Sequence, residues 1–229
     1  MQNTDSMKDE IRLQREKLNG QPFHKKWEYY WGYYKVPAII ILLAACMVGS
    51  IFHTILTRKE TVLSVAYINA FPNVDDTQFM SGFNSYLGIN SGKQDTSLDS
   101  GFYLSDNPNN PYAATYAQKL SAMAMAGKLD VAVADEYYFA SYANQGFFQD
   151  LTPLLSEAQM VQYQDSFYYC DLPDDNIPQA VPVGINVTNA SRILETASYP
   201  NTIAYYGIVA GSQYTDNALS FLSYLESAP

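Results

Sequence analysis

The chain has 229 residues, 13 of them basic and 23 acidic, so its net charge at pH 7 is −10. Residues 60–229 hold 18 acidic and four basic side chains, which gives this part a net charge of −14. Such an acidic surface repels phosphate groups and excludes binding to nucleic acid or anionic lipid headgroups. The only histidines are His24 and His53. Residues 60–229 therefore lack the base of a Ser-His-Asp or Cys-His site and a histidine ligand for zinc.

An uncharged run of 21 residues, Val36–Leu56, is the strongest single feature of the chain. As a helix rising about 1.5 Å per residue it reaches roughly 31 Å, and a hydrocarbon core is about 30 Å thick. Aromatic residues and lysines crowd residues 23–35, as is typical of a membrane interface. We therefore expect a transmembrane helix over residues 36–57.

The distribution of basic residues predicts the orientation of this helix. Residues 1–35 hold seven basic side chains, and only Arg58 and Lys59 follow the span closely. The positive-inside tendency places the N-terminus in the cytoplasm. We thus expect a cytoplasmic tail with an aromatic and basic juxtamembrane segment over residues 1–35, and an extracytoplasmic domain over residues 60–229. The expected location is a bacterial cell membrane, crossed once.

Cys46 allows another interpretation of the apolar run. Leu43-Ala44-Ala45-Cys46 matches a bacterial lipoprotein cleavage site, after which Cys46 would carry lipid. A secretory signal has a short basic leader and an apolar stretch of about 7–15 residues, whereas 35 residues precede this run. The sequence favours an uncleaved span, with lipidation of Cys46 or a cleaved signal as alternatives.

Beyond the span, short apolar runs alternate with segments of helical periodicity. Strands are expected at residues 62–68, 97–104, 129–134, 179–185 and 203–210. Helices are expected at 75–87, 112–126, 136–144, between 155 and 164, and at 216–225. This alternation predicts an α/β domain with a mostly parallel sheet flanked by helices and right-handed crossovers. Because Cys170 is its only cysteine, the domain has no internal disulfide.

Several segments of the domain resemble a known family. Lys128–Asp135 reads as a strand ending in Asp, and Ala143–Leu154 contains a Gly-aromatic turn followed by Asp-Leu-Thr-Pro-Leu. This pattern is similar to extracellular solute-binding proteins of bacterial ABC importers. Ala180–Gly184 resembles the crossover strand of that family, and Tyr205–Leu225 its returning strand and helix.

The chain departs from this family in length. Family members have two lobes that close on a ligand, whereas only about 18 residues separate Gly184 from Ile203, where the second lobe is inserted. The resemblance therefore implies a single periplasmic-binding-protein-like lobe without an opposing jaw.

Loops at the carboxyl ends of strands bind ligands in open α/β sheets. This rule singles out residues after the first and third strands as candidates for ligand or partner binding: Asn69, Phe71, Asn73, Asp135, Glu136, Tyr137 and Tyr138. Simpler interpretations remain for some of them, since Asp135 suits a helix N-cap and the tyrosines suit packing.

These observations favour a non-enzymatic, membrane-anchored domain that docks a membrane partner such as a transporter. One alternative is a module that binds a small molecule, a sugar or a peptide, through the same loops. A carboxylate-type hydrolase is a second alternative. No cofactor or metal is expected, although an acidic loop containing Asp171, Asp174 and Asp175 has some capacity for Ca²⁺.

Overall fold

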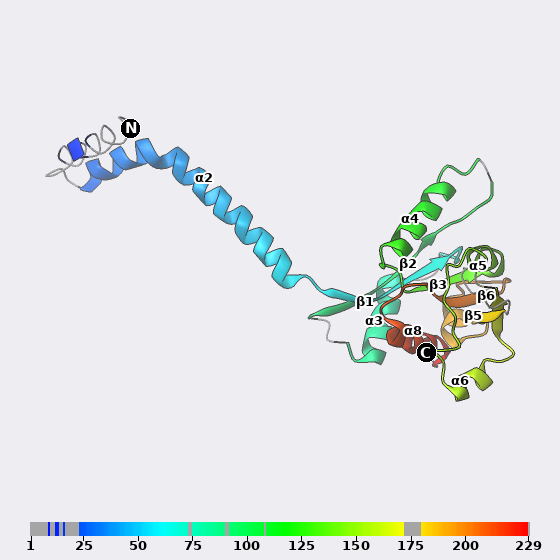
Figure 1. The fold of residues 1–229 in the computed structure, drawn as a ribbon. Coiled ribbons are helices and arrows are strands. Elements are labelled where there is room, and N and C mark those ends of the chain that lie inside the picture. Colours follow the sequence, from blue (N-terminus) through cyan, green and yellow to red (C-terminus); the bar gives the residue numbers. More distant parts are fainter. Residues whose placement is uncertain are drawn as a thin grey trace. The chain divides into compact units, whose positions relative to one another are not determined.

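The computed structural model describes residues 9, 12, 13, 16, 23–72, 75–89, 92–107, 109–171 and 180–228. The chain divides into two compact units, Met1–Arg58 and Lys59–Pro229, both drawn in Figure 1. Helix α2 (Phe23–Thr57) makes up the first unit. Its segment Lys35–Thr57 is long and apolar enough to cross a membrane, and none of it is buried by the rest of the chain.

The second unit is built on one six-stranded sheet with the strand order β2-β1-β3-β6-β5-β4. Its first half is parallel: β1 (Glu60–Ile68) lies between β2 (Gln94–Phe102) and β3 (Val131–Asp135) and runs in the same direction as both. The crossovers between these strands are helices, as the alternating sequence pattern predicts. The α/β class with a sheet flanked by helices is confirmed.

The other half of the sheet is antiparallel, which corrects the expectation of a mostly parallel sheet. β6 (Ala204–Ile208) runs against β3, β5 (Val181–Asn186) against β6, and β4 (Phe167–Cys170) against β5. Neither β4 nor α7 (Ser191–Thr196) was expected from the sequence. The six residues of α7 span only about 9 Å, so the chain turns back at the edge where β5 ends and enters β6 in the reverse direction.

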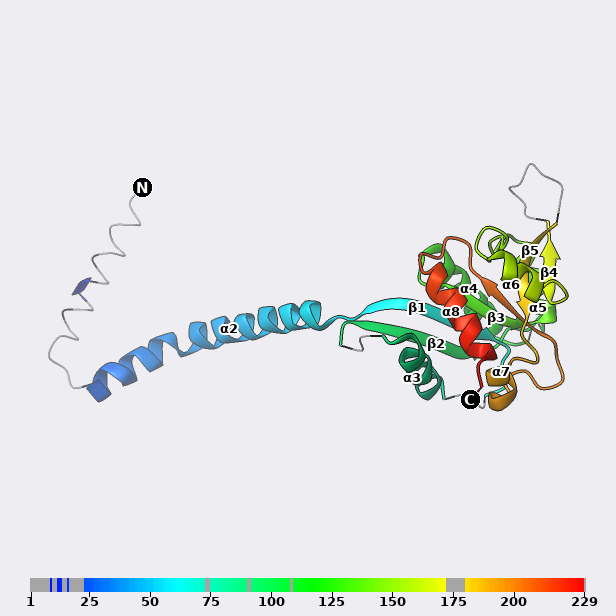
Figure 2. The same cartoon turned by 90° about the horizontal axis from the view of Figure 1, so that it is seen from below.

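Two layers of helices cover the sheet, one on each face (Figures 1 and 2). Helices α3 (Asp76–Leu87) and α8 (Thr215–Glu226) pack on one face, and α4 (Ala113–Met125) and α5 (Glu136–Ala143) pack on the other. The short helix α6 (Glu157–Gln162) joins the first layer through the side chain of its own Met160 and through Tyr163, which follows it. Strands β1 and β3 are therefore buried on both faces, which explains their unbroken apolar runs.

Polar side chains cap helices α3, α5 and α6, and the cap at Asp135 was expected from the sequence. The Asp75 carboxylate accepts a hydrogen bond from the backbone N–H of Gln78 at the start of α3. Asp135 caps α5 in the same manner. Ser156 and Gln159 form a reciprocal capping box at α6. Each cap satisfies backbone donors that have no partner inside the helix, and so fixes where the helix begins.

Carboxylates also accept hydrogen bonds from backbone N–H groups of β2, the edge strand of the parallel half. The backbone N–H of Ser100 donates to Asp76 at 3.0 Å, and that of Thr96 donates to Asp95 at the same distance. Edge strands with free backbone donors are templates for pairing with other chains. The bound carboxylates and their negative charge thus disfavour strand addition at β2.

Two glycines let an aromatic pair lie directly on the sheet. Phe139 of α5 and Phe148 stack with ring centroids 4.3 Å apart. A Cβ placed on Gly207 would lie 2.5 Å from Phe148, and one on Gly184 would lie 2.3 Å from Phe139. No real side chain tolerates such distances, so α5 depends on glycine at both positions for its close approach to β5 and β6.

We predict that Gly207→Ala destabilises the domain by about 1–3 kcal/mol, because the added methyl group forces the Phe139–Phe148 stack off the sheet. Chemical unfolding of the full chain in detergent, followed by tyrosine fluorescence, measures this loss. Gly101→Ala is the control, since its nearest neighbour is the flexible end of Asp99 at 3.2 Å. Equal unfolding midpoints for the two variants would contradict the packing argument.

Candidate functional site

The carboxyl ends of β1, β2 and β3 meet at one edge of the sheet because the three strands are parallel. Since β6 is antiparallel to β3, the residue before it lies at the same edge. We call this edge the strand-end rim and define it by eight residues: Asn69, Phe71, Asp106, Asp135, Glu136, Tyr137, Leu194 and Ile203.

Asn69 joins the three parallel strands at the rim. Its side-chain amide donates to Asp135 at 2.9 Å, and its side-chain oxygen accepts from the backbone N–H of Leu104 at 2.7 Å. Asn69 has a φ of +56°, a left-handed conformation that asparagine tolerates better than most residues. Asp135 receives a second bond from the backbone N–H of Tyr138 at 3.0 Å, so this carboxylate is both a helix cap and a cross-link.

Two tyrosine hydroxyls converge on the carboxylate of Asp106, which follows β2. The hydroxyl of Tyr137 donates to one oxygen of Asp106, and that of Tyr138 donates to the other at 3.3 Å. The hydrogen bond with Asp106 raises the pKa of Tyr137 above its usual value. Burial, together with the Asp106 charge, raises the pKa of Tyr138 to about 12. Both phenols therefore stay protonated donors at neutral pH.

Large apolar side chains project from the rim into solvent. Phe71 is 52% exposed, Tyr137 62%, Leu194 60% and Ile203 38%. Leu194 and Ile203 border a hollow of about 440 Å³ between α7 and β6. These side chains form the apolar component of the rim.

Hydrogen bonds hold the backbone beneath these side chains. The N–H of Phe71 donates to the carbonyl of Ser198 at 2.6 Å, and that of Glu136 donates to Ile203 at 2.9 Å. Below them, the buried hydroxyl of Tyr199 contacts the carbonyl oxygens of Ile68 and Val133 at 3.1 and 2.8 Å. Hydrogen bonds thus connect the backbone under the exposed side chains among β1, β3, α5 and the loop before β6.

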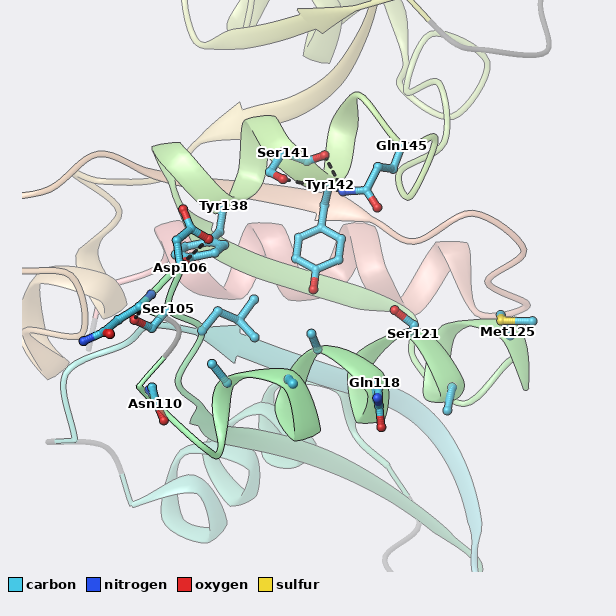
Figure 3. A pocket seen from close by; sticks show the side chains of 16 residues that line it. Ser105, Asp106, Asn110, Gln118, Ser121, Met125, Tyr138, Ser141, Tyr142 and Gln145 are labelled. Carbon is cyan, nitrogen blue, oxygen red and sulfur yellow. Dashed lines mark hydrogen bonds between the residues drawn. The ribbon is translucent and has the colours of Figure 1, made fainter.

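A second concave feature, the α4–α5 trough, opens beside the rim and has a volume of about 720 Å³. Figure 3 shows Tyr142 pointing from α5 toward α4, with Ser121 on the opposite wall and Tyr138 and Asp106 at one end. The walls combine alanines with uncharged polar side chains, namely Ser105, Asn107, Asn110, Gln118, Ser121, Ser141 and Gln145. The trough therefore offers hydrogen-bonding groups on a largely apolar surface.

The structure brings most of the sequence-selected residues together at the rim. Asn69, Asp135 and Tyr138 form one hydrogen-bonded group, while Phe71, Glu136 and Tyr137 surround it. Asn73 lies outside the described residues. Asp135 acts as a cap, as the simpler interpretation anticipated, but it also bonds Asn69. Tyr138 is half-buried and borders the trough, so it serves packing as well.

Three rim residues were missed by the sequence analysis. Asp106 follows the second strand, so the same strand-end rule that selected Asn69 would have found it. Leu194 and Ile203 carry no such signal, because α7 and the direction of β6 are not apparent from local sequence.

The acidic loop after β4 is described only at Asp171, since Asp174 and Asp175 lie outside the described residues. Among the residues that the structure describes, no group of three or more His, Cys, Asp or Glu side chains is arranged to hold a metal ion.

Comparison with protein-family models, with curated proteins and with solved structures finds no match to this chain. The geometry of the rim and of the trough is therefore the basis for any functional argument.

We predict that Asn69→Ala destabilises the domain by about 2–4 kcal/mol. It removes two hydrogen bonds, each worth about 0.5–1.5 kcal/mol, and leaves alanine in the left-handed region at a cost of about 1 kcal/mol. Asn69→Gly should lose about 1 kcal/mol less, because glycine has no such cost. Urea unfolding of the variants measures both.

Asn201→Ala is the matched control, because Asn201 is also left-handed, with a φ of +62°, and is exposed at a loop. It should show the conformational cost alone. If Asn69→Ala were no more destabilising than Asn201→Ala, the hydrogen bonds of Asn69 would contribute nothing to the rim.

Proposed function

We propose that this protein is a membrane-anchored, extracytoplasmic domain that resembles one lobe of a solute-binding protein and docks a membrane partner, such as a transporter, without catalysing a reaction. The strand-end rim is the docking surface. The helix over residues 36–57 is the anchor in a bacterial cell membrane. The tail over residues 1–35 is cytoplasmic, and residues 60–229 lie outside the cell.

The anchor rests on length, composition and charge. The segment Lys35–Thr57 is long and apolar enough to cross a membrane, and the seven basic residues before residue 36 favour a cytoplasmic N-terminus. Cys46 is exposed on this helix, and its lipidation after cleavage is the alternative mode of attachment. Both modes leave residues 60–229 attached to the membrane.

The exposed apolar side chains of the rim carry the docking proposal. Phe71, Tyr137 and Leu194 are each more than half exposed, and long-range hydrogen bonds hold the backbone at Phe71 and at Glu136, the residue before Tyr137. Apolar side chains that gather on one ordered surface are typical of protein interfaces. In a two-lobed solute-binding protein, the loops at this edge would face the second lobe, and here the segment between Gly184 and Ile203, where that lobe would be inserted, has only about 18 residues.

The α4–α5 trough supports a second candidate function, which is binding of a small molecule. Its volume of about 720 Å³ falls within the range of ligand pockets, and Tyr138 and Tyr142 offer rings and hydroxyls to a sugar or a peptide. The hydrolase alternative requires two carboxyl groups in one cleft. Among the described residues that line the trough, Asp106 is the one carboxylate.

Photo-crosslinking in membranes of the native host tests the docking proposal. With a benzophenone amino acid in place of Phe71 or Tyr137, we expect one discrete crosslinked membrane protein, because the rim is covered in the assembled state. Tyr86 is the control position: it is 51% exposed and lies at the end of α3 that precedes β2. Equal crosslinking from position 86, or none from the rim, would contradict the proposal.

Thermal-shift screening of the full chain against sugars and peptides tests the second candidate. A compound that binds in the trough should raise the melting temperature, and Ser121→Trp should abolish the shift by filling the space between α4 and α5. Thr115→Trp on the exposed part of α4, outside the trough lining, is the control. A shift that survives Ser121→Trp would place the binding site elsewhere.

A further inference from the structure

The chemistry of the rim identifies the kind of surface that would cover it. Its apolar part consists of Phe71, Tyr137, Leu194 and Ile203. Charged side chains accompany them: Glu136 is exposed at the first turn of α5, the half-buried Asp135 precedes it, and the Asp106 carboxylate accepts a hydrogen bond from Tyr137, which follows Glu136. None of the eight residues that define the rim is therefore basic.

The basic side chains of the domain lie elsewhere or are already paired. Lys93 precedes β2 and Lys128 precedes β3, so both lie at the edge opposite the rim. Lys119 bonds Asp99 at 2.6 Å. Arg192 bonds Glu195 at 3.2 Å and also stacks on the ring of Tyr224. The negative charge of the rim is thus not neutralised by these cations.

We infer that the rim binds a protein segment that presents apolar anchors flanked by lysine or arginine side chains. This inference rests on the proposed docking function and adds the chemistry of the partner. Apolar anchors would cover Phe71, Leu194 and Ile203, while the basic flanks would face Glu136 and Asp106. Complementary charges of this kind raise association rates and exclude partners of the wrong sign.

The negative charge of the rim also argues against two other binding partners, a second copy of the chain and an anionic membrane surface. In a symmetric dimer through the rim, two surfaces that each carry the negative charge of Glu136 and Asp106 would face each other, and like charges brought together oppose association. An anionic membrane surface would repel the rim for the same reason. A basic protein segment is the occupant whose charge and apolar content both match.

Binding of designed peptides to the full chain in phosphatidylcholine nanodiscs tests this inference. The probe is a fluorescent helical peptide with a leucine and phenylalanine stripe flanked by lysines, and its twin carries glutamates in place of the lysines. Fluorescence anisotropy, corrected with empty nanodiscs, should show at least tenfold tighter binding of the lysine peptide at low salt. The preference should shrink at high salt because exposed charges are screened.

Matched variants locate the binding. Glu136→Lys should weaken binding of the lysine peptide about tenfold, and Glu136→Gln, which is gentler to the helix, should weaken it less. Asp216→Lys is the control, because Asp216 is an exposed acid in the first turn of α8 at the opposite edge. Phe71→Ser should weaken both peptides, whereas Tyr86→Ser should weaken neither.

Equal affinity for the two peptides, or equal effects of Glu136→Lys and Asp216→Lys, would overturn the basic-partner inference. Concentration-dependent self-association that Phe71→Ser abolishes would assign the rim to a second copy instead. If the rim crosslinks a membrane protein in cells but shows no charge preference here, docking stands and only the partner chemistry is wrong. If neither result appears, the docking function fails as well.

Discussion

Burial of two neighbouring strands on both faces is the constraint on which the domain depends. Val65–Ile68 of β1 and Val131–Ala134 of β3 are almost completely inaccessible to solvent. A strand can be buried in this way only when a helical layer covers each face. Parallel strands need crossover connections, which here are helices of these layers, and the parallel direction places the loops after β1, β2 and β3 at a single edge. The position of the strand-end rim is thus a consequence of the core.

The rim itself is stabilised by polar groups from different parts of the chain. Asn69 connects the loop after β1 to Asp135 and to Leu104, and Asp106 binds two tyrosines of α5. Because Asp106 and Asp135 accept hydrogen bonds from groups within the domain, these two carboxylates stabilise the loops. The exposed side chains at this edge include the apolar Phe71, Leu194 and Ile203. This division of roles is the basis of the docking function that we propose for the rim.

The two halves of the sheet differ in how readily local sequence predicts them. Helical periodicity, together with the N-cap expected at Asp135, predicted the helices of the parallel half to within a few residues of their observed bounds. The antiparallel half depends on contacts between distant segments. Strand β4 has only four residues and α7 six, lengths at which neither a strand nor a helix repeats its pattern often enough to be recognised.

The sequence by itself determined an apolar segment long enough to cross a membrane, the α/β class, and a set of strand-end residues of which Asn69, Phe71 and Asp135 lie at one edge. These follow from composition and short-range periodicity, which act within a few residues along the chain. Only the tertiary structure decided that β6 runs antiparallel, which brings Ile203 beside Glu136 and places Leu194 and Ile203 around one hollow. Strand direction depends on how the helices and loops pack onto the sheet, and that packing is a property of the whole domain.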